Sequence, residues 1–510
     1  MRRYHHDMQQ ILINGHWADS SASADGFQGI DPSSGETRDP VFPCSNWKDL
    51  DSMAEAAMAA SLHPANAEPD RIGRFLELFA DRLDGMRADI ALVAHEETGL
   101  PLETRLAQIE FGRMLGQLRE AAKAARDVSA TSWRAPLIDE ASGIRSDLGP
   151  LGGAVLTIGP NNFPLAFHAV SGGDFAAAIA AGNPVIAKGH PLHPETGSML
   201  ARCAAEAVAE AGLHPATVQY FHQCEPEDGL RLVADPRIAA VGFTGSREAG
   251  LSIKAAADAS GTPCFLEMSS VNPVFILPSA LAERGDQIGG GWAASLLMGT
   301  GQFCTKPGIA IVVGDGADAF VEAAKSSLRE AAPGVLFSAA GVDRLASGID
   351  AVEAAGAVLR CGGASVSPGS RFEPTLLEVD GDDFLKSFEE LSQELFGPVG
   401  LVVRAGDLDE ASRIALRFDG QLTATMYTGG DDDTDWNALE PILRVKCGRL
   451  IENKMPTGVA VVPSMVHGGP FPATGHPGFT AVGLPTSVHR FAMARCWDGV
   501  ASGRLPAWLR

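Results

Sequence analysis

The chain has 510 residues, of which 45% are hydrophobic and 20% are charged, with a net charge of −23 and a pI of about 4.9. This length predicts roughly two to four domains and a large apolar core. So negative a field repels phosphate backbones and anionic membrane surfaces, which argues against nucleic-acid and membrane-surface partners. Any anionic ligand must therefore meet positive groups placed locally in its site.

Eight cysteines are scattered along the chain, without a Cys-x-x-Cys pair or a His/Cys spacing typical of a metal centre. We therefore expect no metal site and no disulfide framework. The N-terminus leads into no apolar segment, and no run of about 18 apolar residues occurs. These patterns predict a reduced, cytoplasmic protein without membrane insertion.

The first part of the chain predicts a hairpin and then helices. Residues 11–17 alternate and turn at an Asn-Gly pair, which is a hairpin signal. Alanine- and leucine-rich segments with helical spacing follow, and they predict helices at 48–63, 70–95 and 103–127. A less regular stretch, 133–147, predicts a ribbon.

From Leu151 short apolar strands alternate with helices, which is the pattern of βαβ units in a parallel sheet. Strands are expected at 152–160, 183–188, 217–221 and 239–244, and helices at 174–181 and 196–211. The alternation restarts after Cys304, with strands expected near 309–313, 399–403 and 459–462. The sequence therefore predicts an α/β fold. The final stretch, 487–510, is expected to pack against another subunit.

Cys304 lies on a glycine-rich turn, between an apolar run and the strand expected at 309–313. Glycines on both sides of a cysteine let the backbone bend tightly and allow another group to approach closely. That arrangement suits a nucleophile. The alternative is a small buried apolar side chain, which is the usual fate of a free cysteine.

Two motifs suggest a nucleotide. Phe243-Thr244-Gly245-Ser246 follows a strand and opens a helix, where backbone N–H groups and the helix dipole favour a pyrophosphate. Lys188 ends a strand, at the edge of a parallel sheet where nucleotides bind. A turn without ligand and a solvated lysine are the alternatives.

Three further stretches contain candidate catalytic or binding residues. Glu267 follows an apolar pair, and a carboxylate beside a low-dielectric wall can serve as a general base. Asn162 lies on a rigid turn, and its amide can donate to a developing oxyanion. Glu394 and Phe396 stand just ahead of a Gly-Pro turn. A strand-end charge, an ordinary turn residue and a helix end are the respective alternatives.

Together and in this order, these motifs resemble those of the aldehyde dehydrogenase superfamily over nearly the whole chain. The matching stretches are Ile13–Trp17, Asn162–Pro164, Lys188, Phe243–Ser246, Glu267, Gly301–Cys304, Glu394–Pro398 and Pro456–Val459. The resemblance implies two Rossmann-related parallel-sheet domains and a small β oligomerisation element, in a homodimer or homotetramer. It places a cofactor-binding domain at 1–130 and 148–277, a catalytic domain at 278–470, and the oligomerisation element at 131–147 and 484–510.

The resemblance also implies roles in catalysis. Cys304 attacks the aldehyde as a thiolate, Asn162 and the Cys304 N–H hold the oxyanion, and Glu267 activates the water that hydrolyses the thioester. The cofactor takes the hydride. The implied cofactor contacts are Lys188 and Glu394 at the ribose hydroxyls, Ser246 at the pyrophosphate, Phe396 at the nicotinamide end, and Phe243, Thr244 and Gly245 in the same turn as Ser246.

Departures from the family pattern bear on the cofactor. An acid often stands three positions after Lys188, where it accepts from the ribose 2′-hydroxyl and repels a 2′-phosphate. Pro191 replaces it here, so we expect NADP as the preferred cofactor, with NAD as the alternative. Lys454 stands where a glycine is typical, and the sequence assigns it no effect.

Three stretches resemble those of 2-oxoglutarate semialdehyde (2,5-dioxopentanoate) dehydrogenases: residues 162–167, 190–194 and 467–474. Bacterial NADP-linked fatty-aldehyde dehydrogenases are a closely related group. An acid semialdehyde needs a cation for its carboxylate. Arg113 is the candidate, on a helix that resembles the family's substrate-channel helix, with an ordinary salt bridge as the alternative. A fatty aldehyde needs only an apolar tunnel, for which the candidates are Phe167, Phe303 and Phe471. We favour the acid semialdehyde, with 2-oxoglutarate as product.

Three other functions remain as alternatives. A relative that passes the acyl group to coenzyme A usually lacks the glutamate that Glu267 represents. A catalytically silent relative, acting as a structural or binding protein, leaves the intact set of Cys304, Glu267 and Asn162 unexplained. A cysteine hydrolase without cofactor leaves Lys188 and Glu394 unexplained, and it needs a histidine partner that the sequence does not identify.

Overall fold

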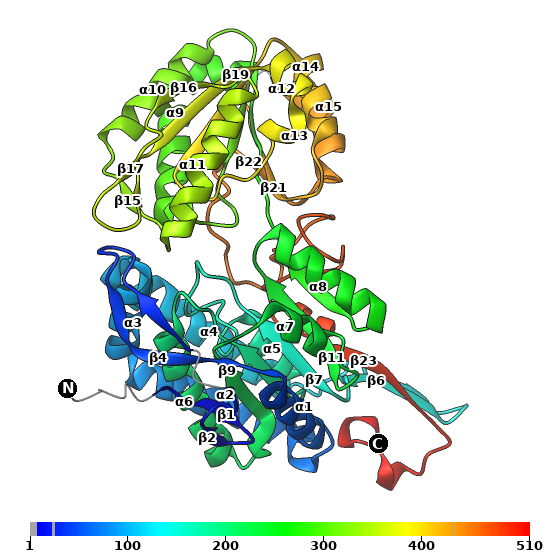
Figure 1. Ribbon diagram of the computed structural model, residues 1–510. Coiled ribbons are helices and arrows are strands. Elements are labelled where there is room, and N and C mark those ends of the chain that lie inside the picture. The colour runs from blue at the N-terminus through cyan, green and yellow to red at the C-terminus, as the bar shows by residue number, and fades with distance from the viewer. Residues whose placement is uncertain (1–7, 23–25, 431) are drawn as a thin grey trace, which may run out of the picture.

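The computed structural model describes residues 8–22, 26–430 and 432–510. Figure 1 shows two lobes, each built on a seven-stranded sheet flanked by helices, and an arm that projects from the lower lobe. The first lobe contains the elements up to β12, and the second lobe contains β13 to β22. After β22, residues 453–491 run back to the first lobe, and we call them the return segment.

The sheet of the first lobe has the strand order β12-β11-β7-β8-β9-β1-β2. Its strands are β1 (Ile11–Ile13), β2 (His16–Ala18), β7 (Ala154–Ile158), β8 (Val185–Lys188), β9 (Val218–Phe221), β11 (Ile238–Thr244) and β12 (Cys264–Glu267). The strands from β12 to β9 are parallel, and the hairpin β1–β2 extends the sheet in the antiparallel sense. Asn14 and Gly15 both have positive φ, so the predicted Asn-Gly turn is confirmed.

The helices of the first lobe cover this sheet. They are α1 (Trp47–Ser61), α2 (Pro69–Gly85), α3 (Arg87–Thr98), the π-helical η2 (Leu102–Glu110), α4 (Phe111–Arg126), α5 (Gly173–Ala180), α6 (Pro194–Ala211), α7 (Pro226–Val233) and α8 (Arg247–Ser260). The single helix predicted over 70–95 is wrong, because Met86 has non-helical torsions and separates α2 from α3. The helix predicted over 103–127 likewise divides into η2 and α4.

The sheet of the second lobe has the order β16-β19-β20-β14-β13-β21-β22. Its strands are β13 (Val274–Ile276), β14 (Ile309–Val313), β16 (Val358–Cys361), β19 (Thr375–Asp380), β20 (Val399–Ala405), β21 (Gln421–Tyr427) and β22 (Cys447–Glu452). All pair in parallel except β16, which is antiparallel to β19. Its helices are α9 (Pro278–Leu297), α10 (Ala317–Glu330), α11 (Ala339–Ala354), α12 (Gly381–Lys386), α13 (Phe388–Leu391), α14 (Leu408–Arg417) and α15 (Asp433–Arg444).

The strand expected near 459–462 is wrong. These residues form no strand, and the edge position beside β21 belongs to β22 instead. Gly458, with a φ of +96°, precedes the segment and Pro463 follows it, so its apolar residues lie in irregular backbone.

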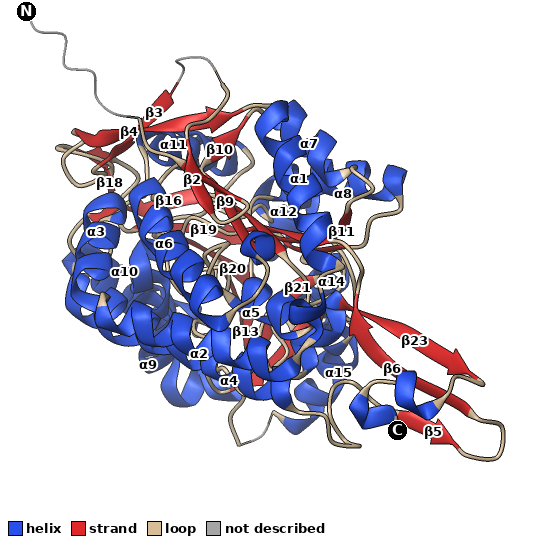
Figure 2. Cartoon of the chain, turned by 90° about the horizontal axis from the view of Figure 1, so that it is seen from below, coloured by secondary structure: helices blue, strands red, loops and turns tan. Residues whose placement is uncertain are grey.

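Three small sheets complete the fold. Their strands are β3 (Gly26–Ile30), β4 (Thr37–Ser45) and β10 (Gln223–Cys224); β15 (Gly334–Val335), β17 (Ser365–Val366) and β18 (Arg371–Phe372); and β5 (Leu137–Asp139), β6 (Ile144–Pro150) and β23 (Ala492–Asp498). The last sheet forms the arm in Figure 2. The predicted ribbon and the C-terminal segment therefore lie side by side, and Asp147 of β6 binds both Arg495 and Trp508.

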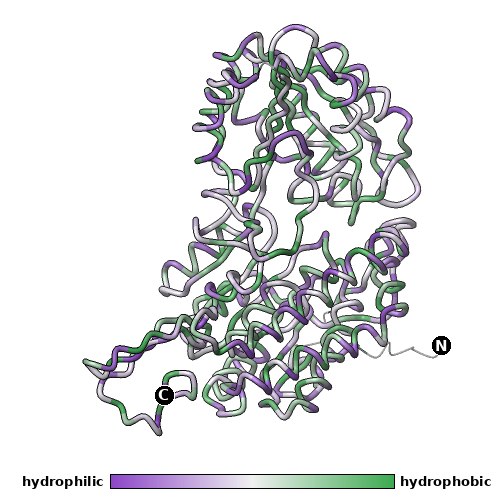
Figure 3. Tube along the Cα trace, turned by 180° about the vertical axis from the view of Figure 1, so that it is seen from behind, coloured by the Kyte–Doolittle hydropathy of each residue, from purple (hydrophilic) through white to green (hydrophobic). Residues whose placement is uncertain are grey.

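Short helical turns join these elements: η1 (Pro64–Ala67), η3 (Pro215–Thr217), η4 (Met298–Gly301), η5 (Thr486–Phe491), η6 (Ser502–Arg504) and η7 (Ala507–Leu509). Hydrophobic segments run through the interior of each lobe in Figure 3, and the strands β7, β14 and β21 are almost entirely buried. Among the described residues, none of the helices is both long and apolar enough to cross a bilayer. The α/β fold with two parallel sheets agrees with the prediction.

Candidate active site

The first lobe brings four predicted site residues to one edge of its sheet. Asn162 follows β7, Lys188 ends β8, Ser246 follows β11, and Glu267 ends β12. These four strands are parallel neighbours, so their carboxyl ends lie along the same edge. The chain folds this way because each strand is a short apolar run ended by a polar or turn-forming residue. The four residues therefore lie along the same edge of the sheet.

The second lobe places Cys304 just before β14 and Glu394 before β20, and these two strands are neighbours. The turn ahead of Cys304 needs glycine at Gly301, whose φ is +66°. A side chain at Gly301 would also collide with the carbonyl oxygen of Gly397, 2.0 Å from its Cβ position. The nucleophile loop and the turn that carries Glu394 are thus packed backbone against backbone.

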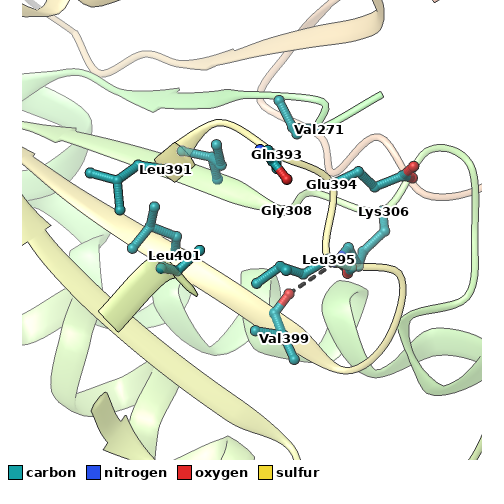
Figure 4. Close-up of a pocket in the computed structure, with 11 residues that line it drawn as sticks. Val271, Lys306, Gly308, Leu391, Gln393, Glu394, Leu395, Val399 and Leu401 are labelled. Carbon is teal, nitrogen blue, oxygen red and sulfur yellow. Dashed lines mark hydrogen bonds between the residues drawn. The ribbon is translucent and has the colours of Figure 1, made fainter. Parts of the chain in front are cut away.

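Asn272 and Lys306 tie this loop down. The Asn272 side-chain amide donates to the carbonyl oxygens of Cys304 and Lys306, at 2.8 and 2.9 Å. The buried Lys306 ammonium donates to the carbonyls of Leu395, Gly397 (3.3 Å) and Val399 (2.9 Å). Figure 4 shows it reaching this turn beside a small cavity of about 10 Å³. Three carbonyl acceptors satisfy the three donors of an ammonium group.

The chemical centre of the site consists of Cys304, His467 and Glu267. His467 Nε2 lies 3.5 Å from Cys304 Sγ and 2.9 Å from Glu267 Oε1. His467 and Glu267 are both almost fully buried. His467 Nε2 therefore lies between the Cys304 sulfur and the Glu267 carboxylate, within reach of a proton on either group.

The sequence did not identify His467 as the partner of Cys304, from which it is 163 positions away. The return segment brings it there by pairing with β12, since Met268 N–H donates to Ala473 O at 2.8 Å and Glu267 bridges to Thr474. In the sequence, the His467-Gly468-Gly469-Pro470 stretch indicates only the substrate class. Its sequence carries no signal that points to the cysteine.

Burial is the main influence on the Cys304 thiol. It raises the pKa well above the usual value for cysteine, and the negative charge and hydrogen bond of Glu267 act in the same direction. The nearby Arg113 guanidinium opposes them. The thiol is therefore neutral in this arrangement, and reactivity requires that its proton move to an acceptor such as His467 Nε2.

Asn162 is held beside the nucleophile. Its Nδ2 donates to the carbonyl oxygen of Gln302 at 2.9 Å, which leaves the second amide hydrogen free to meet a ligand. A buried ion pair of Arg105 and Glu110 fixes its loop. Arg105 donates to the Asn162 carbonyl at 3.1 Å, and Glu110 accepts from the N–H groups of Leu165 and the next residue.

Arg113 lies on α4 and points toward this centre. Its guanidinium carbon is 4.5 Å from the centroid of the Phe167 ring. Its Nε and Nη2 atoms are buried without a hydrogen-bond partner among the described residues. Burial lowers the pKa of Arg113, and the acidic groups of Cys304, Glu110 and Glu267 act against that shift. The structure thus does not place Arg113 in an ordinary salt bridge.

Two of the three predicted tunnel phenylalanines gather here and one does not. Phe163 joins them, with ring centroids 5.0 Å from Phe167 and 5.4 Å from Phe303. Phe167 also meets the His467 ring edge-on at 6.3 Å. Phe471 lies apart on the surface with 55% of its side chain exposed, because it belongs to the outer side of the return segment. Phe163 was not singled out in the sequence.

Two of the predicted cofactor residues, Glu394 and Phe396, line a second cavity. A cavity of about 150 Å³ is lined by Asn161, Gln302, Leu336, Phe337, Ser338, Gly341, Arg344, Leu345, Glu394, Leu395 and Phe396. Burial raises the pKa of Glu394 to about 7, while hydrogen bonds from Ser269 and Ser270 and the Lys306 charge act against the shift. Burial likewise lowers the pKa of Lys306 to about 8.

The other two strand ends complete this part of the site. Lys188 donates to the Gly189 carbonyl at 3.1 Å, so it retains donors for a ligand, and burial lowers its pKa. Ser246 caps α8 through a bond from Ala249 N–H. Gly245 packs so closely on the Phe243 ring that a Cβ would lie 2.6 Å from it, and Thr244 precedes the turn at the end of β11. Backbone N–H groups at this helix start favour an anion.

Comparisons with known proteins identify the family of this chain. Residues 17–470 match the model of the aldehyde dehydrogenase family. The chain is 38% identical to alpha-ketoglutaric semialdehyde dehydrogenase 2 of Azospirillum brasilense over 96% of this chain and 94% of that protein. It is 34% identical to alpha-ketoglutaric semialdehyde dehydrogenase of Acinetobacter baylyi, with the same coverage of both chains.

Solved structures show the same fold. Lactaldehyde dehydrogenase from Escherichia coli superposes with a TM-score of 0.82 at 22% sequence identity, covering 96% of this chain and 98% of the other. At this identity the likeness concerns the fold alone. The family match over most of the chain, with the two relatives above 30% identity, carries the assignment. This chain belongs to the aldehyde dehydrogenase family and is an NAD(P)-dependent oxidoreductase that acts on aldehydes.

Proposed function

We propose that the chain oxidises 2,5-dioxopentanoate, the semialdehyde of 2-oxoglutarate, to 2-oxoglutarate. The observation that carries this proposal is the Arg113 guanidinium, which has two buried nitrogens without a partner among the described residues. It also lies close enough to Cys304 to oppose the rise that burial causes in the pKa of that thiol. An unpaired buried cation is costly, and a substrate carboxylate would supply the missing acceptors. The names of the two relatives point to the same substrate.

In the first half of the proposed reaction, Cys304 passes its proton to His467 and attacks the aldehyde carbon. The new C–S bond pushes an electron pair onto the carbonyl oxygen, where the free Asn162 amide hydrogen and the Cys304 N–H donate to it. The product is a thiohemiacetal on Cys304. Bound NAD(P) supplies the hydride acceptor for the oxidation that leaves a thioester.

In the second half, Glu267 takes a proton from water, which attacks the thioester and releases the acid and the Cys304 thiolate. This role is supported by two observations: Glu267 Oε1 contacts His467, and the buried Oε2 has no hydrogen-bond partner among the residues that the structure describes. A carboxylate oxygen in that state is available to orient a water molecule. The aromatic rings of Phe163, Phe167 and Phe303 exclude bulk water from the substrate side.

Two residues of the second cavity, Glu394 and Phe396, and two strand-end residues of the first lobe, Lys188 and Ser246, fit a dinucleotide cofactor. Lys188 has unused donors, and Glu394 can accept from ribose hydroxyls when ionised. Phe396 lines the same cavity, while Ser246 opens the helix that would meet the pyrophosphate. We propose NADP as the preferred cofactor because Pro191 offers no acid against a 2′-phosphate.

We also propose that the first lobe binds the cofactor and that the second carries the nucleophile. The sequence predicts the boundary after residue 277, but β13 (Val274–Ile276) pairs within the second sheet, so we place the boundary before Val274. We further propose that the arm mediates a homodimer or homotetramer. It exposes apolar side chains that a partner subunit would cover, including Leu137 (68% exposed) and Met493 (44% exposed). Light scattering measures the oligomeric state of the intact chain and of Leu137→Asp, and the substitution should shift it toward the monomer.

The experiment that tests the substrate follows reduced cofactor by absorbance, with NADP and NAD, for 2,5-dioxopentanoate and a long-chain aldehyde. Arg113→Met should lower kcat/KM for the dioxo acid by roughly ten- to a hundredfold and leave the long-chain aldehyde unaffected. Arg119→Met is the matched control, since Arg119 lies on the same helix but pairs with Asp81 at the surface. Equal effects of Arg113→Met on both aldehydes would rule out the carboxylate contact.

The aromatic cluster keeps a fatty aldehyde as the second candidate, because Phe163, Phe167 and Phe303 would also suit an apolar chain. Turnover of the long-chain aldehyde alone by the wild-type enzyme would retain the chemistry and replace the substrate. No turnover of any aldehyde would instead favour a silent relative.

A further inference from the structure

The Cys304, His467 and Glu267 side chains offer a sulfur, a nitrogen and an oxygen in one place. These three ligand atoms all lie within 4.8 Å of one another. The sequence spacing excluded a metal motif, but the fold joins residues that lie far apart in the chain. The cluster is therefore a candidate coordination site.

The distances suit a tetrahedral zinc ion. With bonds of about 2.3 Å to sulfur and about 2.0–2.1 Å to nitrogen and oxygen, tetrahedral angles put sulfur and nitrogen about 3.5 Å apart and nitrogen and oxygen about 3.3 Å apart. The corresponding separations are 3.5 Å from Cys304 Sγ to His467 Nε2 and 2.9 Å from His467 Nε2 to Glu267 Oε1. Little movement would be needed to receive the ion.

The charge and the rigidity of the cluster also favour a divalent cation. A thiolate and a carboxylate together balance a divalent cation, and a neutral imidazole completes three ligands. Within the described part of the chain, the buried Glu267 Oε2 has no hydrogen-bond partner, so this oxygen still lacks a donor or a cation. Asn272 holds the Cys304 backbone, and pairing of the return segment with β12 holds Glu267 and His467. The ligands are thus preorganised.

We propose that Cys304, His467 and Glu267 form a site for Zn²⁺ or a similar borderline-soft divalent ion, and that its occupation reversibly inhibits the enzyme. The ion displaces the Cys304 thiol proton to solvent and forms a metal–sulfur bond, with no change of oxidation state. The sulfur can then no longer attack an aldehyde. Three protein ligands leave the fourth position to water. Mixed S, N and O ligands disfavour Mg²⁺ and Ca²⁺, which prefer oxygen.

The test begins with binding, which does not depend on turnover. Metal-free protein is titrated with Co²⁺, whose thiolate charge-transfer band and tetrahedral visible bands report a sulfur-ligated site, and Zn²⁺ should bleach them at one ion per chain. Cys304→Ser should abolish the charge-transfer band. His467→Asn and Glu267→Gln should each weaken Zn²⁺ binding by about tenfold or more. Having two such variants covers the case in which one fails to fold.

Inhibition is measured next on the wild-type enzyme with any aldehyde it oxidises. Zn²⁺ should inhibit and EDTA should restore the rate, whereas Mg²⁺ at the same concentration should leave it unchanged. Cys496→Ser is the matched control, because Cys496 is exposed on the arm, and its inhibition by Zn²⁺ should equal that of the wild type.

Several outcomes would overturn the proposal. One is a cobalt spectrum without a sulfur band, and another is unchanged Zn²⁺ affinity in both His467→Asn and Glu267→Gln. Loss of inhibition in Cys496→Ser would place the zinc on the arm. Failure of the substrate proposal alone would leave the binding results intact, so the two proposals can be distinguished.

Discussion

The two lobes present their functional residues from opposite ends of their strands. In the first lobe, Asn162, Lys188 and Glu267 follow the carboxyl ends of parallel strands, where α/β sheets usually bind ligands. In the second lobe, Cys304 and Glu394 precede the amino ends of β14 and β20. The first lobe therefore uses an edge that its topology already provides, whereas the second needs dedicated contacts to hold its loops.

Those contacts are the Asn272 amide and the Lys306 ammonium, which together join the nucleophile loop to the 395–399 turn. The lobes also differ in histidine. Residues 274–452 contain none, so the second lobe cannot supply a partner for its own cysteine. The return segment delivers His467 against the first lobe instead. The nucleophile and its proton acceptor thus come from different parts of the chain, and each can be altered separately.

The largest effect is expected for the nucleophile of the second lobe. Cys304→Ala should reduce aldehyde oxidation by at least about ten-thousandfold, because no covalent intermediate can form. Absorbance of reduced cofactor measures the rate, and the melting temperature should stay within a few degrees. Cys264→Ala, at a half-exposed cysteine of the first lobe, is the control and should retain full activity. Residual turnover within tenfold of wild type would refute Cys304 as the nucleophile.

A smaller loss is expected when the proton acceptor is removed. His467→Asn should lower kcat/KM by roughly a hundredfold, since the buried thiol then loses the base within 3.5 Å. Alkylation of Cys304 by iodoacetamide, followed at its own peptide by mass spectrometry, should slow in parallel. His476→Asn is a matched control on the exposed part of the same segment. Unchanged alkylation would mean that another group activates the sulfur.

Low pH should destabilise the first lobe more than the second. Burial lowers the pKa of His193 and His222 in the first lobe to about 4, from 6.5. Between these pH values the unfolded chain binds more protons than the folded chain. The free energy of unfolding therefore falls as pH drops from about 6.5 to 4, on the order of 3 kcal/mol for each histidine. Hydrogen exchange at pH 5 and pH 7 should show the first lobe losing more protection. An equal loss of protection in both lobes would contradict this prediction.

The mildest effect concerns the contact that holds the second lobe's cofactor residue. Lys306→Met should raise the KM for NAD(P) by about tenfold, since the turn carrying Glu394 loses a charged hydrogen-bond donor. Alkylation of Cys304 should change little, because Asn272 still holds its loop. Lys325→Met, at a lysine of α10 paired with Glu322, is the control. A matching fall in kcat and in Cys304 alkylation would indicate general damage.

The sequence by itself determined the fold class, the parallel sheets and the motif residues of both lobes. It could do so because strand periodicity, glycine turns and strand-end polar residues are local properties, written over a few positions. Two of its errors were local as well. The helix break at Met86 and the irregular backbone after Gly458 depend on torsions that composition does not reveal.

Only the tertiary structure decided which distant groups meet. His467 reaches Cys304 because the return segment pairs with β12, and nothing near His467 in the chain encodes that contact. Arg113 emerges as an unpaired cation only once its surroundings are known, since a salt bridge would look the same in sequence. Lys306 likewise reads as a surface lysine until its three carbonyl partners are seen. Burial and partnership are properties of the packed chain, and they set the chemistry of this site.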